Sequence, residues 1–311
     1  MFSVIIPTYN GIDILRQSLP TWFDQTMAAD EFEVIVVDNR STDVTRCEVE
    51  KMIEGKPNFR YLFESQPGAT SARHAGARAS KGDILVFADN DGLFNPECLQ
   101  RIKEVYEGNA LCEAVTCKIE LQWDGEEPEW IAPYRQLLGY LDYGDSVRYG
   151  YDLYLNGGLM SVKKNTFERL HGFNPDLMGE NLIGDGDTGF VKKLFNNHCL
   201  IGYSPQSVMQ HMQKVATHGS INGVAKHFYN NGTADAYALF RKNHFEMTHE
   251  MVVFKRKQRL SLIKKQIQYR VMRQRSLHNF FSIQQRKGSL IFFKYLKQPE
   301  LARLIKVEDV Y

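Results

Sequence analysis

The chain has 311 residues, of which 43% are hydrophobic and 12% aromatic, which is enough for one large or two modest domains with a sizeable core. No stretch reaches the roughly 18 apolar residues of a membrane-spanning helix, and the start at Met1–Pro7 lacks the basic flank of a signal peptide. Five scattered cysteines without a CxxC pair favour free thiols over a disulfide framework. We therefore expect a cytoplasmic protein.

The net charge of +1 hides an uneven distribution. From Met251 to Tyr311 the chain carries 15 basic and 3 acidic residues, whereas residues 1–250 carry 23 basic and 34 acidic ones. An acidic body and a basic tail suggest two segments with different roles. The acidic body would repel phosphate backbones, so we expect no nucleic-acid partner.

The first ninety residues alternate between apolar runs and segments with helical spacing. Four apolar runs predict strands at Phe2–Ile6, Phe32–Val37, Phe59–Phe63 and Ile84–Ala88. Ile12–Thr26 has helical apolar spacing, and a helix of small residues follows Pro67-Gly68. Repeated strand–helix units predict an α/β fold with a mostly parallel sheet flanked by helices.

Polar residues follow these strands on what should be one edge of the sheet, where α/β proteins bind ligands. Asp89-Asn90-Asp91, a DXD-type motif, ends the fourth strand, Asp38 ends the second, and Tyr9 follows the first. Asp38 and Tyr9 suit a base or sugar, whereas Asp89 and Asp91 suit Mg²⁺ or Mn²⁺ together with phosphates, with which Arg73 could pair. The alternative is that each Asp only forms a turn or caps a helix.

The second half has a different pattern. A helix at Pro96–Tyr106 and a strand at Ala114–Leu121 precede an irregular aromatic region, 123–154, and such segments are often functional. Asp185-Gly186-Asp187 opens another helix, where an Asp is either a cap or a general base. His211 ends a short apolar segment and is either structural or a further ligand of a carboxylate-bound cation.

Several of these segments together resemble the family 2 glycosyltransferases. The matching segments, in the order and spacing of that family, are Ser3–Asn10, Val36–Asp38 with Ser41-Thr42-Asp43, Gly68 to Gly76, Lys81–Asp83 and Phe87–Asp91. Gly172-Phe173, Gly184 to Lys193 and Pro205 to His211 are similar to the acceptor-side motifs. The resemblance covers roughly residues 1–240.

The resemblance implies a GT-A fold with a Rossmann-like sheet and a hexosyltransferase that moves a sugar, with inversion, from a nucleotide-sugar to a hydroxyl. A UDP-linked donor, Mn²⁺ or Mg²⁺, and a role in surface polysaccharide or glycan synthesis are expected. The nucleotide-sugar would be bound by Pro7, Tyr9, Asp38, Arg73, Asp89 and Asn90. Asp91 and His211 would hold the metal, and Asp187 would be the catalytic base.

The sequence departs from the family pattern at three places. Asn39-Arg40 stands where Asp-Gly is usual, and His74 stands where Asn is often found. Gly186-Asp187 replaces the usual Glu-Asp pair, so that a shifted register would make Asp185 the base. We favour Asp187 because Phe190 and Lys193 then keep their expected places.

Two alternative functions remain. One is a catalytically silent subunit that holds a nucleotide or a partner, which the altered acidic motif keeps open. The other is a nucleotidyltransferase, which would normally carry a glycine-rich, basic loop after the first strand, a feature that residues 7–11 lack.

We expect a glycosyltransferase domain at 1–245, with a nucleotide-binding half at about 1–110 and an acceptor half at about 111–245, and a basic, amphipathic helical extension at 246–311. Between Phe254 and Phe281, basic residues alternate with apolar ones at helical spacing, namely Leu260, Ile263, Ile267 and Val271. Such a helix can lie on an anionic membrane, and Leu290–Phe293 could add an apolar anchor. The alternative is a helix packed on the body.

A membrane-bound extension would bring the protein to the inner face of the cytoplasmic membrane. There the acceptor would be a glycan or a lipid-linked sugar.

Overall fold

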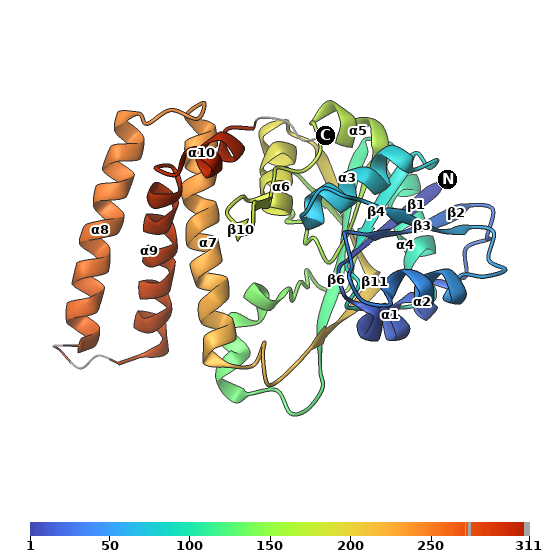
Figure 1. The fold of residues 1–311 in the computed structure, drawn as a ribbon. Coiled ribbons are helices and arrows are strands. Elements are labelled where there is room, and N and C mark those ends of the chain that lie inside the picture. Colours follow the sequence, from blue (N-terminus) through green and yellow to red (C-terminus); the bar gives the residue numbers. More distant parts are fainter. Residues whose placement is uncertain (271, 273–274, 308–311) are drawn as a thin grey trace.

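The computed structural model, which describes residues 1–270, 272 and 275–307, contains a nine-stranded sheet (Figure 1). The strand order is β3-β2-β1-β4-β8-β6-β11-β5, with β7 paired to β11. The strands are β1 Phe2–Thr8, β2 Phe32–Asp38, β3 Phe59–Phe63, β4 Ile84–Ala88, β5 Gly92–Phe94, β6 Cys112–Trp123, β7 Arg148–Gly150, β8 Leu159–Lys163 and β11 Leu200–Gln213. The predicted α/β architecture is confirmed.

Strands β1, β2, β3 and β4 run parallel, and β8 joins them antiparallel between β4 and β6. The first strands are continuous apolar runs because both faces of the sheet are covered. Val4 and Ile6 contribute to the core on one face, whereas Ile5, between them, contributes to the core on the other. Because β2 and β4 both pair with β1 in parallel, the carboxyl ends of these three strands lie at a common edge.

Helices cover both faces of the sheet. They are α1 Ile12–Ser18, α2 Thr45–Met52, α3 Ala69–Ala79, α4 Cys98–Gly108, α5 Lys164–Arg169 and α6 Gly186–Asn196, with 3₁₀ turns at Leu19–Trp22 and Glu129–Leu138. The predicted helix Ile12–Thr26 is shorter than expected, because a 3₁₀ turn with Pro20 in its first positions follows Ser18. Helix α3 packs closely on β1: a Cβ at Gly76 would lie 2.4 Å from Ile5 Cγ2.

The last part of the described chain forms four helices. They are α7 Ile221–Lys242, α8 His249–Arg270, α9 Leu277–Tyr295 and α10 Pro299–Ile305. Figure 1 shows α7, α9 and α8 side by side next to the body, with α8 outermost. Tyr237 and Phe240 of α7 pack in one core with Phe292 and Phe293 of α9. This core also includes Met178 and Ile183. Met178 ends β9 Leu177–Met178, which forms a small hairpin with β10 Asn181–Leu182, and Ile183 follows β10.

Two expectations for the basic extension are wrong. The apolar run Leu290–Phe293 is no exposed anchor, since Phe292 is buried against Phe240 of α7 and Phe293 is buried beside Phe254 of α8. The predicted helix between residues 254 and 281 is two helices, α8 and α9, and the predicted apolar position Val271 lies outside the described residues.

The domain border at residue 245 stays a prediction, because α7 of the expected first domain packs along α9 of the extension. In the described part of the chain, no helix is long and apolar enough to cross a bilayer. The five cysteines are free thiols, as expected, and four of them are buried.

Candidate active site

The ends of β1 and β2 lie next to each other, as predicted, but Asp38 is already engaged. It is buried, accepts a hydrogen bond from Tyr61 Oη at 2.8 Å, and accepts another from the backbone N–H of Ser41 at 2.8 Å. Burial, followed by the Asp38 hydrogen bond, raises the pKa of Tyr61, which stays protonated as the donor. Pro7 is buried in β1, whereas Tyr9 is 62% exposed and free to contact a ligand.

Arg73 on α3 connects three elements near the end of β4. Its side chain is buried, and Nη2 donates to Asp89 Oδ1 at 2.5 Å and to the carbonyl of Gly157 at 3.1 Å. Burial lowers the pKa of Arg73, but the carboxylates of Asp89 and Asp187 outweigh it, so the pKa is raised. The predicted phosphate-binding arginine is therefore paired with the first Asp of the DXD-type motif.

The two other residues of this motif point to different partners. Asn90 Nδ2 donates to Thr8 Oγ1 at 3.0 Å, which ties the motif to β1. Asp91 Oδ2 lies 3.3 Å from His211 Nε2 of β11. The structure thus brings together Asp91 and His211, which the sequence analysis considered as ligands of one cation.

Protonation of this pair is set by mutual attraction. Burial alone would raise the pKa of Asp91, but the hydrogen bond and charge of His211 outweigh it, so the pKa is lowered. Burial alone would lower the pKa of His211, but Asp91 outweighs it, so the pKa is raised. Asp89, by contrast, has a raised pKa because burial and the Asp91 charge exceed the effect of Arg73.

Asp91 and His211 fit a divalent cation that also binds phosphate. Among the described residues, no group of three or more His, Cys, Asp or Glu side chains forms a complete metal site. Asp91 Oδ1 is nevertheless buried without a hydrogen-bond partner, which is a costly arrangement unless a ligand satisfies it. Mg²⁺ sites typically use one or two carboxylates and complete their coordination with substrate phosphates and water.

The two candidate bases lie in different surroundings at the start of α6. Asp185 is buried; Oδ1 accepts from Asn174 Nδ2 at 2.8 Å, and Oδ2 lies 3.5 Å from Lys192 Nζ. Asp187 Oδ1 accepts from its neighbour, the backbone N–H of Thr188, at 2.8 Å, and no hydrogen bond from a described residue reaches Oδ2.

Asp187 lies close to Gly157, whose carbonyl binds Arg73. A Cβ at Gly157 would lie 2.2 Å from Asp187 Oδ2 and 3.3 Å from Arg73 Nη2, so only a glycine leaves room for both side chains. Asp187 thus lies at the junction between the Arg73–Asp89 pair and the cavity on its other side.

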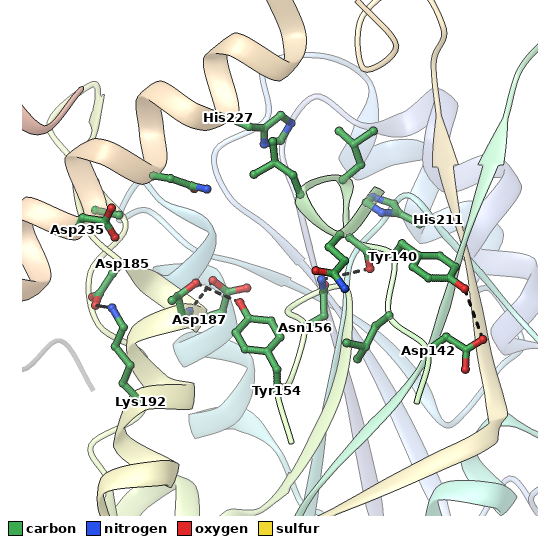
Figure 2. A pocket seen from close by; sticks show the side chains of 18 of the residues that line it. Tyr140, Asp142, Tyr154, Asn156, Asp185, Asp187, Lys192, His211, His227 and Asp235 are labelled. Carbon is green, nitrogen blue, oxygen red and sulfur yellow. Dashed lines mark hydrogen bonds and ion pairs between the residues drawn. The ribbon is translucent and has the colours of Figure 1, made fainter. Parts of the chain in front are cut away.

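That cavity has a volume of about 680 Å³ and lies between the body and the C-terminal helices. Figure 2 shows Asp187, Tyr154, Asn156 and His211 on the body side, while His227 and Asp235 border it from α7. Further lining residues are Tyr140, Asp142, Tyr143, Thr188, Lys192, Asn231 and, on α9, Gln285. A smaller cavity of about 220 Å³ adjoins Asp187 and Arg73.

Sequence reasoning pointed to the aromatic region 123–154 and missed the contribution of α7 and α9. Tyr140, Tyr143 and Tyr154 line the cavity, whereas Asp235 and Gln285, joined by a 3.2 Å hydrogen bond, belong to helices in which no site residue was predicted. No local spacing could have identified them, because their position depends on how the helices pack on the body.

Two departures from the family pattern have a structural role. His74 is fully buried and accepts a hydrogen bond from the backbone N–H of Phe173 at 2.9 Å, so it fixes the segment that leads to α6. Arg40 has φ 69°, the left-handed region that favours glycine, at the position where the family usually has one.

The comparisons with known proteins agree with this architecture. Residues 3–150 match the family model described as glycosyl transferase family 2. Validoxylamine A glucosyltransferase of Streptomyces hygroscopicus is 37% identical over 117 residues, which are 37% of this chain and 28% of the relative. The poly(ribitol-phosphate) beta-N-acetylglucosaminyltransferase TarP of Staphylococcus aureus is 30% identical over 99 residues, 32% of this chain and 30% of the relative. The chain thus spans less than a third of the length of these relatives.

Solved structures extend the similarity to nearly the whole chain. A mannosyltransferase of Pyrobaculum calidifontis, in complex with GDP-Man and Mn²⁺, superposes with a TM-score of 0.56 at 19% identity, covering 97% of this chain and 73% of the other. Residues 1–349 of S. aureus TarS, in complex with UDP-GlcNAc, give a TM-score of 0.53 at 17% identity, covering 96% and 92%.

The family match ends before Asp187 and His211, so their roles depend on the geometry alone. The order of the strand-end motifs, the sheet they build and the match over residues 3–150 lead to one assignment. Residues 3–150, just under half of the chain, form a family 2 glycosyltransferase domain, and the chain has the GT-A fold.

Proposed function

We propose that this protein transfers a sugar from a nucleotide-sugar to a hydroxyl group with inversion, and that Asp187 is the general base. The observation that carries the proposal is the position of Asp187. Its Oδ2 accepts no hydrogen bond from the described residues and lies between the Arg73–Asp89 pair and a 680 Å³ cavity. Asp185, already engaged by Asn174 and Lys192, is better suited to hold the loop.

In this mechanism the donor lies on the β4 side and the acceptor in the cavity. Asp187 takes the proton of the acceptor hydroxyl while the hydroxyl oxygen bonds to the anomeric carbon and the bond to the diphosphate breaks. Attack from the face opposite the leaving group inverts that carbon. Arg73, with Asp89, orients the donor, and Tyr9 and Asp38 lie near its nucleoside.

Asp91 and His211 would hold Mn²⁺ or Mg²⁺. When bound, the cation supplies positive charge that stabilises the departing diphosphate. The complexes of similarly folded proteins with UDP-GlcNAc, and with GDP-Man and Mn²⁺, support a nucleotide-sugar donor and a divalent cation, and we favour a uridine-linked donor.

For the acceptor we propose a neutral, hydroxyl-rich glycan or lipid-linked sugar used in surface polysaccharide synthesis. Four carboxylates line the cavity, from Asp142, Asp185, Asp187 and Asp235, against the single ammonium group of Lys192. This excess of negative charge disfavours an anionic acceptor, whereas tyrosine side chains and carboxylates suit sugar hydroxyls. We further propose that the protein works at the inner face of the cytoplasmic membrane, which its basic extension supports.

The test measures release of nucleoside diphosphate from a panel of nucleotide-sugars, with and without Mn²⁺ and a mixture of sugar acceptors. We expect Asp187→Asn to lower turnover about 10²–10⁴-fold while thermal stabilisation by the donor is retained. Asp185→Asn is the matched control and should lower stability more than turnover, because it weakens the contact with Lys192.

Near-normal turnover of the Asp187→Asn variant would eliminate the assignment of the base. The two alternative functions give different results. A silent subunit would be stabilised by the donor and release no diphosphate, and a nucleotidyltransferase would release pyrophosphate from a nucleoside triphosphate.

A further inference from the structure

Helix α8 buries only some of its apolar side chains where it packs on α9. The face that packs on α9 is rich in polar side chains: Lys265 Nζ donates to Asn279 Oδ1 at 2.9 Å, and Ser261 Oγ accepts from Arg286 Nε at 3.3 Å. Gln258 Oε1 on this face is buried without a hydrogen-bond partner. Of the apolar side chains of α8, Met251 and Phe254 pack into the core with α9, whereas four aliphatic ones face away from it.

Those apolar side chains gather on the opposite, outer face. Val252 is 51% exposed, Leu260 59%, Ile263 46% and Ile267 48%. At 100° per residue, these four positions fall within a sector of about 80°, on the side of the helix that faces away from α9. Figure 1 shows that α8 is the outermost helix of the layer, so no described element covers this face.

The same face is strongly basic. Exposed cationic residues lie between and beside the apolar ones, namely Arg256, Lys257, Arg259, Lys264 and Arg270. The single acidic residue of α8 is Glu250, in its first turn. A straight helix of 22 residues is about 33 Å long and can lie flat along a surface over its whole length.

We propose that this outer face of α8 binds the surface of an anionic lipid bilayer, an inference that rests on the membrane location in the proposed function. Aliphatic side chains enter the boundary between headgroups and acyl chains, and the basic side chains contact the anionic headgroups. A second copy of the chain is a poorer partner, because two such faces would bring like charges together.

The experiment sediments the full-length protein with vesicles of phosphatidylcholine alone or of phosphatidylcholine with phosphatidylglycerol. We expect binding to the anionic vesicles that weakens as salt is raised. The triple variant Leu260→Ser/Ile263→Ser/Ile267→Ser should bind the anionic vesicles at least about tenfold more weakly, because it removes half-exposed side chains that lipid would bury.

The matched control is Val44→Ser/Leu111→Ser/Val147→Ser, which removes aliphatic side chains of similar exposure, 58%, 76% and 51%, from the body. Its binding should equal that of the unaltered protein. A second variant, Arg256→Gln/Arg259→Gln/Lys264→Gln, should lose the preference for anionic vesicles.

Equal binding of the α8 variant and the body control would overturn the proposal, as would failure of the unaltered protein to sediment with anionic vesicles. Loss of a dimer in the α8 variant, measured by light scattering without lipid, would assign the face to a second copy and also overturn it. Diphosphate release in solution is measured in parallel. It should be unchanged in all three variants, so failure of membrane binding is distinguishable from failure of the proposed activity.

Discussion

At the scale of single residues, a buried arginine joins the elements of the site. Arg73 contacts Asp89 at the end of β4 and the carbonyl of Gly157 before β8, and both Asp89 and Asp187 raise its pKa. Removing a partner from such a buried charge is costly. The position of each carboxylate, Asp89 or Asp187, therefore depends on Arg73 and on the other carboxylate. The proposed donor and acceptor sides would thereby be coupled through one guanidinium group.

Asp91→Asn tests the metal-binding role. Asparagine keeps the size of the side chain but removes the charge that a divalent cation requires, and we expect the donor affinity in Mn²⁺ to fall about 100-fold. At a donor concentration that stabilises the unaltered protein by about 2.7 kcal/mol, the variant should gain only about 0.4 kcal/mol. Thermal unfolding with UDP-sugar and Mn²⁺ measures this difference.

The control for this experiment is Asp83→Asn. Asp83 is exposed, and its carboxylate forms an ion pair with the N-terminal ammonium group. Its stabilisation by donor and Mn²⁺ should equal that of the unaltered protein. Equal stabilisation of the Asp91 variant would show that the cation is held elsewhere or not needed for donor binding.

At the scale of elements, strands were more predictable from the sequence than long-range packing. The runs Phe59–Phe63 and Ile84–Ala88 are strands with the predicted bounds. Ile84–Ala88 was predictable because a central strand covered on both faces requires continuous apolar sequence. The residues Asp235 and Gln285 could not be assigned to the site, since their contribution depends on the docking of α7 and α9. The pairing of Asp38 with Tyr61 was equally invisible, because β3 supplies its partner.

Helices α7 and α9 cross in close contact at two glycines, which suggests a test of this docking. A Cβ at Gly288 would lie 1.9 Å from the carbonyl oxygen of Tyr229, and one at Gly232 would lie 2.0 Å from that of Gln285. We expect Gly288→Ala to lower the free energy of unfolding by about 2 kcal/mol, because backbone must move to admit the methyl group. Urea unfolding measures the change.

Gly125→Ala serves as the control, since its Cβ would meet only Val215 Cγ2, at an ordinary 3.5 Å. Its unfolding free energy should change by less than about 0.5 kcal/mol. An unaltered stability of Gly288→Ala would mean that the two helices are less closely packed than the structure shows.

At the scale of the whole molecule, the C-terminal helices border the proposed acceptor cavity as well as completing the fold. They close one side of the 680 Å³ cavity, and their core includes Met178 and Ile183 from the body. A face that binds lipid on α8 would be separated from the acceptor cavity by α9 and α7. The extension would then hold the cavity at a defined distance from the bilayer, while α7 and α9 shape the acceptor side.

Truncation after residue 245 tests whether the extension is a separate domain. The shortened chain would expose Tyr237 and Phe240, which are buried against Phe292 and Met251, at roughly 1.5–3 kcal/mol for each side chain returned to water. We therefore expect a Tm lowered by about 10 °C or more and increased aggregation, measured by calorimetry and light scattering. The Leu260→Ser/Ile263→Ser/Ile267→Ser variant is the control with unchanged Tm, because those side chains are exposed. A truncated chain that melts at the temperature of the full chain would instead establish residue 245 as a true domain border, with an extension that docks on the body without stabilising it.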